Sequence, residues 1–334
     1  MPACQPPFQI TSRILSQVAA ISELIGRWSA LGSGTLSPQL CRENRIRTIH
    51  ASLAIENNTL SLDQVTAVFE GKRVLGMPRE IQEVRNAILA YEQMEQWSAH
   101  SATDLLAAHK LLMSALVEQA GSYRQGGVGI CRGDVLVHMA PPANQVPRLI
   151  EDLTHWLAVT DSHPLIASCV FHYEFEFIHP FEDGNGRMGR LWQTLILSQW
   201  QPLLAHLPVE TLIHDRQADY YQALSESDKQ SDATVFVDFM LQAILDAMTE
   251  SQGPSSEEGS EKSTEKGSEK SSEKILSLLL DQPTRSARSL AAALGISPRG
   301  VEKLLAKLRS EGRLERIGAA KGGYWRVIQA KRGG

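Results

Sequence analysis

The stretch that decides the fold is residues 179–190, which read HPFEDGNGRMGR. One helical pattern ends near Ile178 and another begins at about Arg187, with the turn sequence Asp-Gly-Asn-Gly at 183–186 between them. Glycines let a backbone turn several N–H groups toward one point, and the N-terminus of a helix favours negative charge. The stretch therefore predicts an anion-binding loop that opens a helix.

Charged side chains of the same stretch add chemistry to this loop. Arg187 and Arg190 are three residues apart, so they share a helix face, and two guanidinium groups suit a polyphosphate. Asp183 offers a hard oxygen ligand for Mg²⁺, and His179 has a side chain that titrates near neutrality, as a general base must. These residue types together indicate phosphoryl or nucleotidyl transfer.

The twelve residues match the H-x-F-x-[DE]-G-N-G-R-x-x-R signature of Fic-domain proteins, so the chain resembles that family. The resemblance implies an all-α Fic fold with a small β-hairpin flap. It also implies an enzyme, a protein adenylyltransferase that transfers AMP from ATP to a Tyr, Thr or Ser hydroxyl of a target protein and releases pyrophosphate. ATP and Mg²⁺ would be its substrate and cofactor.

The resemblance also assigns roles within the signature. His179 would deprotonate the target hydroxyl, and Phe181 would anchor the loop in the core. Asp183 would hold Mg²⁺ between the α- and β-phosphates.

The remaining signature residues would bind the nucleotide. Gly184, Asn185 and Gly186 would form the anion nest, Arg187 would bind the β-phosphate and Arg190 the γ-phosphate. Relatives that phosphorylate their targets carry Lys at the position of Gly186, so the glycine favours AMP transfer over kinase activity.

A second resemblance lies upstream, where residues 52–57 read SLAIEN. This matches the [ST]-x-x-x-E-[GN] inhibitory motif of many Fic proteins, which lies on a helix, here expected near residues 48–57. The Glu56 carboxylate would pair bidentately with Arg190 and displace the γ-phosphate. Ser52, one turn away, would hold Glu56 by a hydrogen bond.

Residues 128–138 place Val-Gly-Ile-Cys and Val-Leu-Val-His on either side of a turn at 132–134, which predicts a short hairpin. The resemblance makes this hairpin a flap on which the target docks as an added strand. The docking residues would be Val135, Leu136, Val137 and His138. Downstream, Tyr221 and Leu224 would line the adenine.

Apolar residues elsewhere recur at helical spacing, which predicts a mostly helical main domain. The expected helices cover residues 14–25, 81–94, 102–115, 146–157, 165–177, 188–197 and 234–248. Residues 255–274 read SSEEGSEKSTEKGSEKSSEK and contain no apolar side chain, so they predict a solvated tether. We expect four parts: an N-terminal helical region at 1–100, a catalytic core at 101–250, a disordered linker at 251–274 and a small domain at 275–334.

The small domain has its own charge and pattern. Residues 275–334 hold twelve Lys or Arg and four Asp or Glu, a net charge of +8, so a chain total of −5 leaves −13 for residues 1–274. Helical segments, a turn at 295–297 and two strands at 314–317 and 324–328 resemble a winged helix-turn-helix module, an α+β fold. The helix expected after the turn would present Arg299, Lys303 and Lys307 to DNA.

Composition sets outer limits. With 334 residues, 43% apolar and 21% charged, the chain is neither collagenous, fully disordered nor a disulfide scaffold. The four cysteines are scattered, and no leader peptide, membrane span or structural metal site is predicted, so we expect a cytoplasmic protein that does not enter membranes. A homodimer and modification of the protein itself are further expectations.

Two other functions remain open from the sequence. In the first, the reaction runs in reverse and the Glu56 carboxylate positions a water that removes AMP from a modified protein. In the second, the core senses nucleotide and the basic domain acts as a DNA-binding transcriptional regulator.

Overall fold

The computed structural model describes residues 5–30, 37–132 and 135–251, together with a set of positions nearer the C-terminus. These are residues 275–276, 278–280, 283, 285, 289–290, 301, 305, 308–309, 313–317 and 324–328. The chain divides into two compact units, Met1–Ser251 and Gln252–Gly334.

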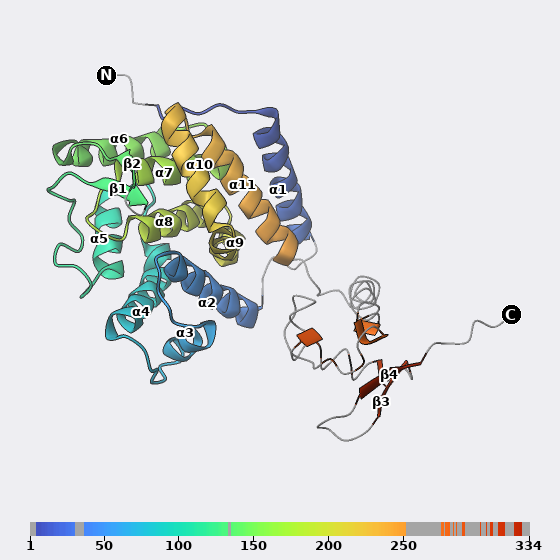
Figure 1. Cartoon of the computed structure of the whole chain (residues 1–334). Helices are drawn as coiled ribbons and strands as arrows, with labels where there is room; N and C mark the ends of the chain where they lie inside the picture. The colour runs from blue at the N-terminus through green and yellow to red at the C-terminus, as the bar shows by residue number, and fades with distance from the viewer. Residues whose placement is uncertain are drawn as a thin grey trace. The chain divides into compact units, whose positions relative to one another are not determined.

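The first unit is built from helices and one short hairpin (Figure 1). Its helices are α1 (Ser12–Ala30), α2 (Pro38–Ile55), α3 (Leu62–Phe69), α4 (Pro78–Gln93), α5 (Ala102–Leu112), α6 (Val146–Val159), α7 (Pro164–Ile178), α8 (Asn185–Trp200), α9 (Val209–Asp215), α10 (Gln217–Gln230) and α11 (Thr234–Ser251). Short 3₁₀ turns cover Met94–Gln96, Ala143–Gln145 and Pro202–His206. All seven helices expected from apolar spacing are present.

The centre of this unit is the pair α7 and α8, whose residues are nearly all buried. Helix α7 begins with Pro164 in its first turn, after His163 accepts a hydrogen bond from the Leu165 N–H, an N-cap arrangement. Helices α6 and α11 pack on α7, and α5 packs on α8. Helix α2 contacts α4, α8 and α9, which brings the N-terminal region onto the core.

Two helices stop two or more residues short of their expected ends, and both have a left-handed residue nearby. The segment expected to be helical over 102–115 ends at Leu112, and Ala115 has φ 60°. Helix α2 ends at Ile55, so Glu56 caps the helix instead of lying within it, and Asn57 has φ 68°. Asparagine tolerates this conformation better than most residues, which allows the chain to turn directly after Glu56.

The predicted hairpin is present. Strands β1 (Gly129–Arg132) and β2 (Val135–Met139) pair antiparallel, with Gly129 opposite Met139 and Arg132 opposite Val135. The register shifts between Ile130 and Cys131, and β2 contacts α10. The expected docking residues at positions 135–138 are thus all on β2.

The second unit contains a small apolar core of its own. Its buried residues are Ile275, Leu276, Leu279, Leu290, Val301, Leu305, Leu308 and Leu314. Strands β3 (Leu314–Ile317) and β4 (Tyr324–Val327) pair antiparallel within this unit, as predicted. Arg299, Lys303 and Lys307 lie outside the described residues, as does the expected tether at residues 255–274. Ser251, placed at the start of the expected linker, is the last residue of α11. Across the described part of the chain, no helix is long and apolar enough to cross a bilayer.

Candidate active site

The loop between α7 and α8 is held in shape by its own residues. His179 ends α7 in a left-handed conformation (φ 50°, ψ 62°), and Gly184 precedes α8 with φ 86°. The Asn185 side chain closes the loop, since its Oδ1 accepts from the Phe181 N–H and its Nδ2 donates to the Phe181 carbonyl, both at 2.9 Å. The backbone amides of the first turn of α8 therefore follow a loop whose shape is fixed by these hydrogen bonds.

Phe181 anchors this turn in the core. Its side chain is fully buried and stacks on the His109 ring, with centroids 3.6 Å apart and planes 2° apart. His109 is neutral, because burial lowers its pKa to about 4. Its Nδ1 accepts from the Gly121 N–H at 2.9 Å, so its Nε2 donates to the Asp183 carbonyl at 3.0 Å. Sequence reasoning missed His109, whose place in the amphipathic pattern of α5 gives no sign of this contact.

Arg190 is the most enclosed charge of the site. Its Nη2 donates to Glu56 Oε1 at 2.7 Å and to the Ser52 carbonyl at 2.9 Å, and its Nε donates to Ser52 Oγ at 3.0 Å. The Arg190 side chain is 1% exposed and that of Glu56 is 31% exposed. The Arg190 Nη1 is buried without a hydrogen-bond partner among the described residues. Although burial opposes it, the pKa of Arg190 is raised, chiefly by the Glu56 charge.

Two details differ from the expected arrangement. The pair is single, through one nitrogen of Arg190, where a bidentate pair was expected. Ser52 accepts its hydrogen bond from Arg190, whereas the sequence suggested that it holds Glu56. The Glu56 carboxylate also lies over Gly186, since a Cβ there would overlap Glu56 Oε1 and stand 3.1 Å from Arg190 Nη1.

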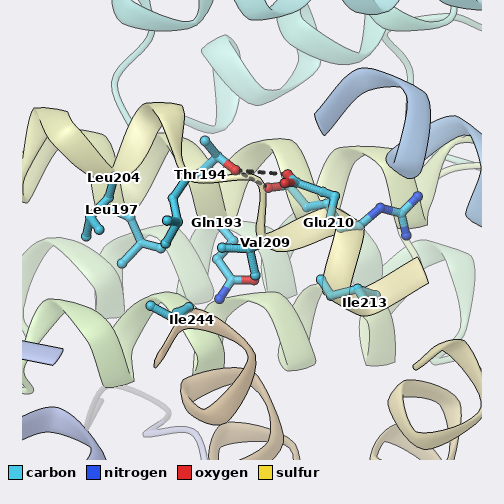
Figure 2. A pocket seen from close by; sticks show the side chains of 10 residues that line it. Gln193, Thr194, Leu197, Leu204, Val209, Glu210, Ile213 and Ile244 are labelled. Atoms are coloured by element: carbon cyan, nitrogen blue, oxygen red, sulfur yellow. Dashed lines mark hydrogen bonds between the residues drawn. The ribbon is translucent and has the colours of Figure 1, made fainter. Parts of the chain in front are cut away.

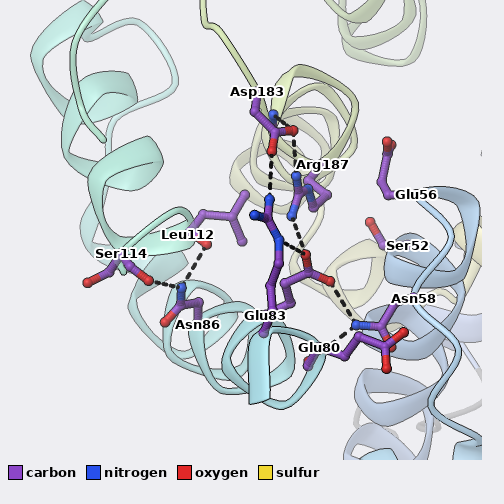
Figure 3. A network of polar contacts seen from close by, with 12 residues as sticks. Ser52, Glu56, Asn58, Glu80, Glu83, Asn86, Leu112, Ser114, Asp183 and Arg187 are labelled. Atoms are coloured by element: carbon purple, nitrogen blue, oxygen red, sulfur yellow. Dashed lines mark hydrogen bonds and ion pairs between the residues drawn. The ribbon is translucent and has the colours of Figure 1, made fainter. Parts of the chain in front are cut away.

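A second group of charges surrounds Arg187 and Asp183 (Figure 3). Arg187 Nη2 donates to Asp183 Oδ1 at 2.8 Å, and its Nη1 lies 3.6 Å from Glu83 Oε1. Arg79 completes a ring of alternating charge, with its Nη2 at 3.4 Å from Asp183 Oδ2 and its Nε at 3.7 Å from Glu83 Oε1. The ring joins α4 to the loop between α7 and α8.

The same ring is tied to the segment that follows Glu56. Asn58 Nδ2 donates to Glu83 Oε2, a member of the ring, at 2.8 Å, and Figure 3 draws this contact. Asn58 also donates to the Glu80 carbonyl at 3.2 Å. Helix α4 thus contacts both the signature loop and the chain beside Glu56, a connection that the sequence did not suggest.

The donor set around Asp183 fits a single magnesium ion held with phosphates. Mg²⁺ is commonly bound by one or two carboxylates, with substrate phosphates and water completing its coordination. Asp183 is partly exposed, with 41% of its side chain accessible, and each of its oxygens is paired with an arginine. Among the described residues no group of three or more His, Cys, Asp or Glu is placed to hold a metal, and a substrate-bridging ion does not require one.

Other expected residues take places around this centre. Tyr221 lies on α10, where burial, followed by the nearby Glu56 charge, raises its pKa. Leu224 is half-buried against the core one turn further along. His172, on α7, is a core residue with Nδ1 at 2.6 Å from Gln193 Oε1 and Nε2 at 3.1 Å from the Tyr220 hydroxyl.

Glu176, on α7, is a buried carboxyl that sequence reasoning did not single out. Burial raises its pKa to about 8, while Arg190 opposes this shift. Its Oε1 would stand 2.9 Å from a Cβ at Gly189, so that glycine keeps α7 and α8 close together here.

The cavity beside Arg190 cannot admit a nucleotide (Figure 2). It measures about 10 Å³, the space of one water, and apolar side chains of α8, α9 and α11 surround much of it. Glu210 lies in its wall and accepts from Tyr91 at 3.2 Å and Thr194 at 3.3 Å, while its other oxygen is without a partner among the described residues.

Comparison with protein families identifies both units. A model of the Fic/DOC family matches residues 99–197, and a model described as winged helix-turn-helix DNA-binding matches residues 269–315. The solved structure of a Fic family protein from Desulfovibrio desulfuricans G20 is 52% identical in sequence, with a TM-score of 0.72. That similarity covers 98% of this chain and 100% of the other.

More distant relatives carry an activity in their names. Protein adenylyltransferase fic-1 of Caenorhabditis elegans is 30% identical over 223 residues, which are 61% of this chain and 41% of that protein. Protein adenylyltransferase Fic of Nematostella vectensis is 26% identical and is covered over 47% of its length. The chain thus spans less than half the length of these curated relatives. A solved segment of the C. elegans protein, 22% identical with a TM-score of 0.57 over 71% of each chain, shares the fold.

Proposed function

The chain belongs to the Fic family, and from this premise we propose that it is a protein adenylyltransferase that transfers AMP from ATP to a side-chain hydroxyl of a target protein. The observation that carries the proposal is the pair of buried arginines at the glycine loop. Arg187 Nε and Arg190 Nη1 are both buried without hydrogen-bond partners among the described residues. Buried guanidinium donors are costly to leave unpaired, and phosphate oxygens are their natural acceptors.

The reaction needs a base and an anion site at a fixed spacing. His179 would take the proton of a Tyr, Thr or Ser hydroxyl, whose oxygen then bonds to the α-phosphorus. The bond from that phosphorus to the bridging oxygen breaks, and pyrophosphate leaves. The amides of residues 184–186, with Arg187 and Arg190, would hold the β- and γ-phosphates in line for this attack.

Asp183 would hold a magnesium ion against the phosphates. Such an ion neutralises charge that develops on the leaving pyrophosphate. To hold the ion, the Asp183 carboxylate would have to give up its contacts with Arg187 and Arg79. The guanidinium groups of these two arginines are themselves suited to pair with the phosphates.

Glu56 would make the resting protein self-inhibited. Its carboxylate accepts a hydrogen bond from Arg190 Nη2, the donor that would otherwise bind the γ-phosphate. Because the carboxylate also lies over Gly186, it would place negative charge where the phosphates must enter. An ATP molecule could then bind only with its α-phosphate displaced from the line of attack.

The target would dock on the hairpin. A two-stranded sheet leaves strand edges open to a third strand, and backbone pairing places a segment without demanding a particular side-chain sequence. An extended segment beside β2 would carry its hydroxyl toward His179.

Labelled ATP tests the reaction. The Glu56→Gly variant, incubated with ATP and Mg²⁺, should incorporate label from the α-phosphate and none from the γ-phosphate, either on itself or on added protein. Incorporation of γ-label would make the protein a kinase and overturn the proposal. The Glu56→Gly/His179→Ala variant should incorporate neither label.

A second proposal concerns the C-terminal unit, which would bind duplex DNA. Its support is the match to the winged helix-turn-helix DNA-binding family and the net charge of +8 on residues 275–334.

A further inference from the structure

Arg124 is a buried cation whose side chain contacts backbone carbonyls. It is 2% exposed, and its guanidinium donates to four of them. Nε donates to the His179 carbonyl at 2.7 Å and Nη2 to the Ile178 carbonyl at 3.2 Å. Nη1 donates to the Gly126 carbonyl at 2.8 Å and Nη2 to the Pro141 carbonyl at 2.6 Å.

These carbonyls belong to two elements. Ile178 and His179 are the last residue of α7 and its cap, where free carbonyls and the helix dipole attract a cation. Gly126 precedes β1 and Pro141 follows β2, so they mark the two ends of the flap. The Arg124 side chain therefore connects both ends of the hairpin, through hydrogen bonds, to the backbone of His179, the expected base.

The backbone at Arg124 strengthens the same link. Its N–H donates to the Pro180 carbonyl at 2.9 Å, so Arg124 contacts three consecutive peptides from Ile178 to Pro180. The middle one belongs to His179, a non-glycine residue in the left-handed region. Such a conformation persists only where its surroundings hold it, and Arg124 supplies direct contacts that do so.

We propose that Arg124 is a positioning residue that keeps the flap and His179 in register, so that a hydroxyl on a segment paired with β2 arrives at the His179 ring. The inference rests on the proposed function, because it takes His179 as the base and the hairpin as the docking strand. A displacement of about 1 Å between reacting groups is enough to slow a reaction on the order of a hundredfold. Nucleotide binding depends on the other end of the loop and should change little.

The test uses full-length protein in the Glu56→Gly background with Arg124→Lys, which keeps the charge but loses the planar fork. We expect the kcat for AMP transfer to protein to fall at least about tenfold, while the KM for ATP changes less than about twofold. Free AMP formed by attack of water needs no flap, so the ratio of protein-bound to free AMP should also fall. The matched control is Arg148→Lys, an exposed arginine of α6 that pairs with Asp152.

Hydrogen–deuterium exchange gives a readout that is independent of activity. Arg124→Lys should speed exchange both in residues 126–141 and in residues 175–181, and leave residues 185–200 unchanged. Unchanged AMP transfer, equal losses of transfer and ATP binding, or faster exchange in only one of the two segments would overturn the inference. If Glu56→Gly itself transfers no AMP, the proposed function fails, and the exchange pattern still decides whether Arg124 joins flap and helix.

Discussion

At the scale of single residues, Arg190 has two different partners. The Ser52 hydroxyl and carbonyl fix its Nε and Nη2, whereas the Glu56 carboxylate adds a charged contact to Nη2. We therefore expect Ser52 to orient the arginine in the absence of Glu56 as well. The two residues of the proposed inhibitory motif would then have opposite effects on nucleotide binding by the same side chain.

Ser52→Ala separates these roles. Removing the hydroxyl leaves Arg190 Nε buried without its acceptor, which should lower the free energy of unfolding by about 1–2 kcal/mol. In the Glu56→Gly background it should raise the KM for ATP several-fold, measured with α-labelled ATP. If Ser52 served to hold Glu56, the single variant would instead be activated to the level of Glu56→Gly.

His109 predicts a dependence of stability on pH. Its pKa is about 4 in the folded protein, below the 6.5 of an unperturbed histidine, so the unfolded chain binds the extra proton between these values. The contribution of His109 to the free energy of unfolding is therefore fully present above pH 6.5. It falls as the pH drops toward 4, by about 2 kcal/mol at pH 5. Urea unfolding at about pH 7 and pH 5 should show a smaller fall for His109→Gln. An equal fall in both proteins would mean that His109 is not the group responsible.

At the scale of elements, α4 connects the proposed inhibitory segment with the signature loop. Asn58 donates to Glu83, and Glu83 faces Arg187 and Arg79. The chain directly after Glu56 thus contacts the same carboxylate that faces Arg187, the arginine proposed to bind the β-phosphate. Loosening that contact should loosen the inhibition.

Asn58→Asp tests this connection. The change keeps the acceptor for the Leu60 N–H but turns a carboxylate toward Glu83, so repulsion should move the segment that carries Glu56. In the wild-type background we expect the rate of AMP transfer to rise by roughly tenfold, which corresponds to the free energy of one charged hydrogen bond. In the Glu56→Gly background we expect the rate to stay unchanged. Gln93→Glu, which adds the same charge at an exposed position of α4, is the control. A rise in both backgrounds would contradict a route through Glu56.

Seven helices were predictable, because apolar spacing reports which face of a helix is buried, whereas α3, α9 and α10 were not among the expected helices. The ends were harder. Helix α2 ends one residue before Glu56, since Asn57 adopts a left-handed conformation that no local pattern requires. The hairpin was predictable because its alternation and its turn agree.

The supporting contacts of the site were not predictable in the same way. Arg124 reaches carbonyls 54 and 55 positions away in sequence, and His109 reaches one 74 positions away. Backbone carbonyls have no sequence signature, so an arginine or histidine that binds them looks like any other in a helix or a loop. A signature reveals the groups that meet the substrate and leaves out those that hold them in place.

At the scale of the whole molecule, the acidic and basic parts of the chain predict separate partners. The −13 of residues 1–274 disfavours DNA, and the +8 of residues 275–334 favours it.

Exchanging Arg299, Lys303 and Lys307 together for Ala should weaken binding of the full-length protein to duplex DNA. The slope of log affinity against log salt should become shallower by about 0.9 for each phosphate that the protein no longer neutralises. AMP transfer by the same protein in the Glu56→Gly background should not change. Binding that is equally tight without the three cations would exclude these three residues from the DNA-binding surface.

The central claim is that Glu56 withholds Arg190 from ATP. The most direct measurement is the initial rate of α-label incorporation from ATP and Mg²⁺ by the wild-type protein and by Glu56→Gly under identical conditions. Removal of one charged hydrogen bond and of the negative charge over Gly186 should raise the rate by roughly 10- to 100-fold. Equal rates in the two proteins would contradict inhibition by Glu56.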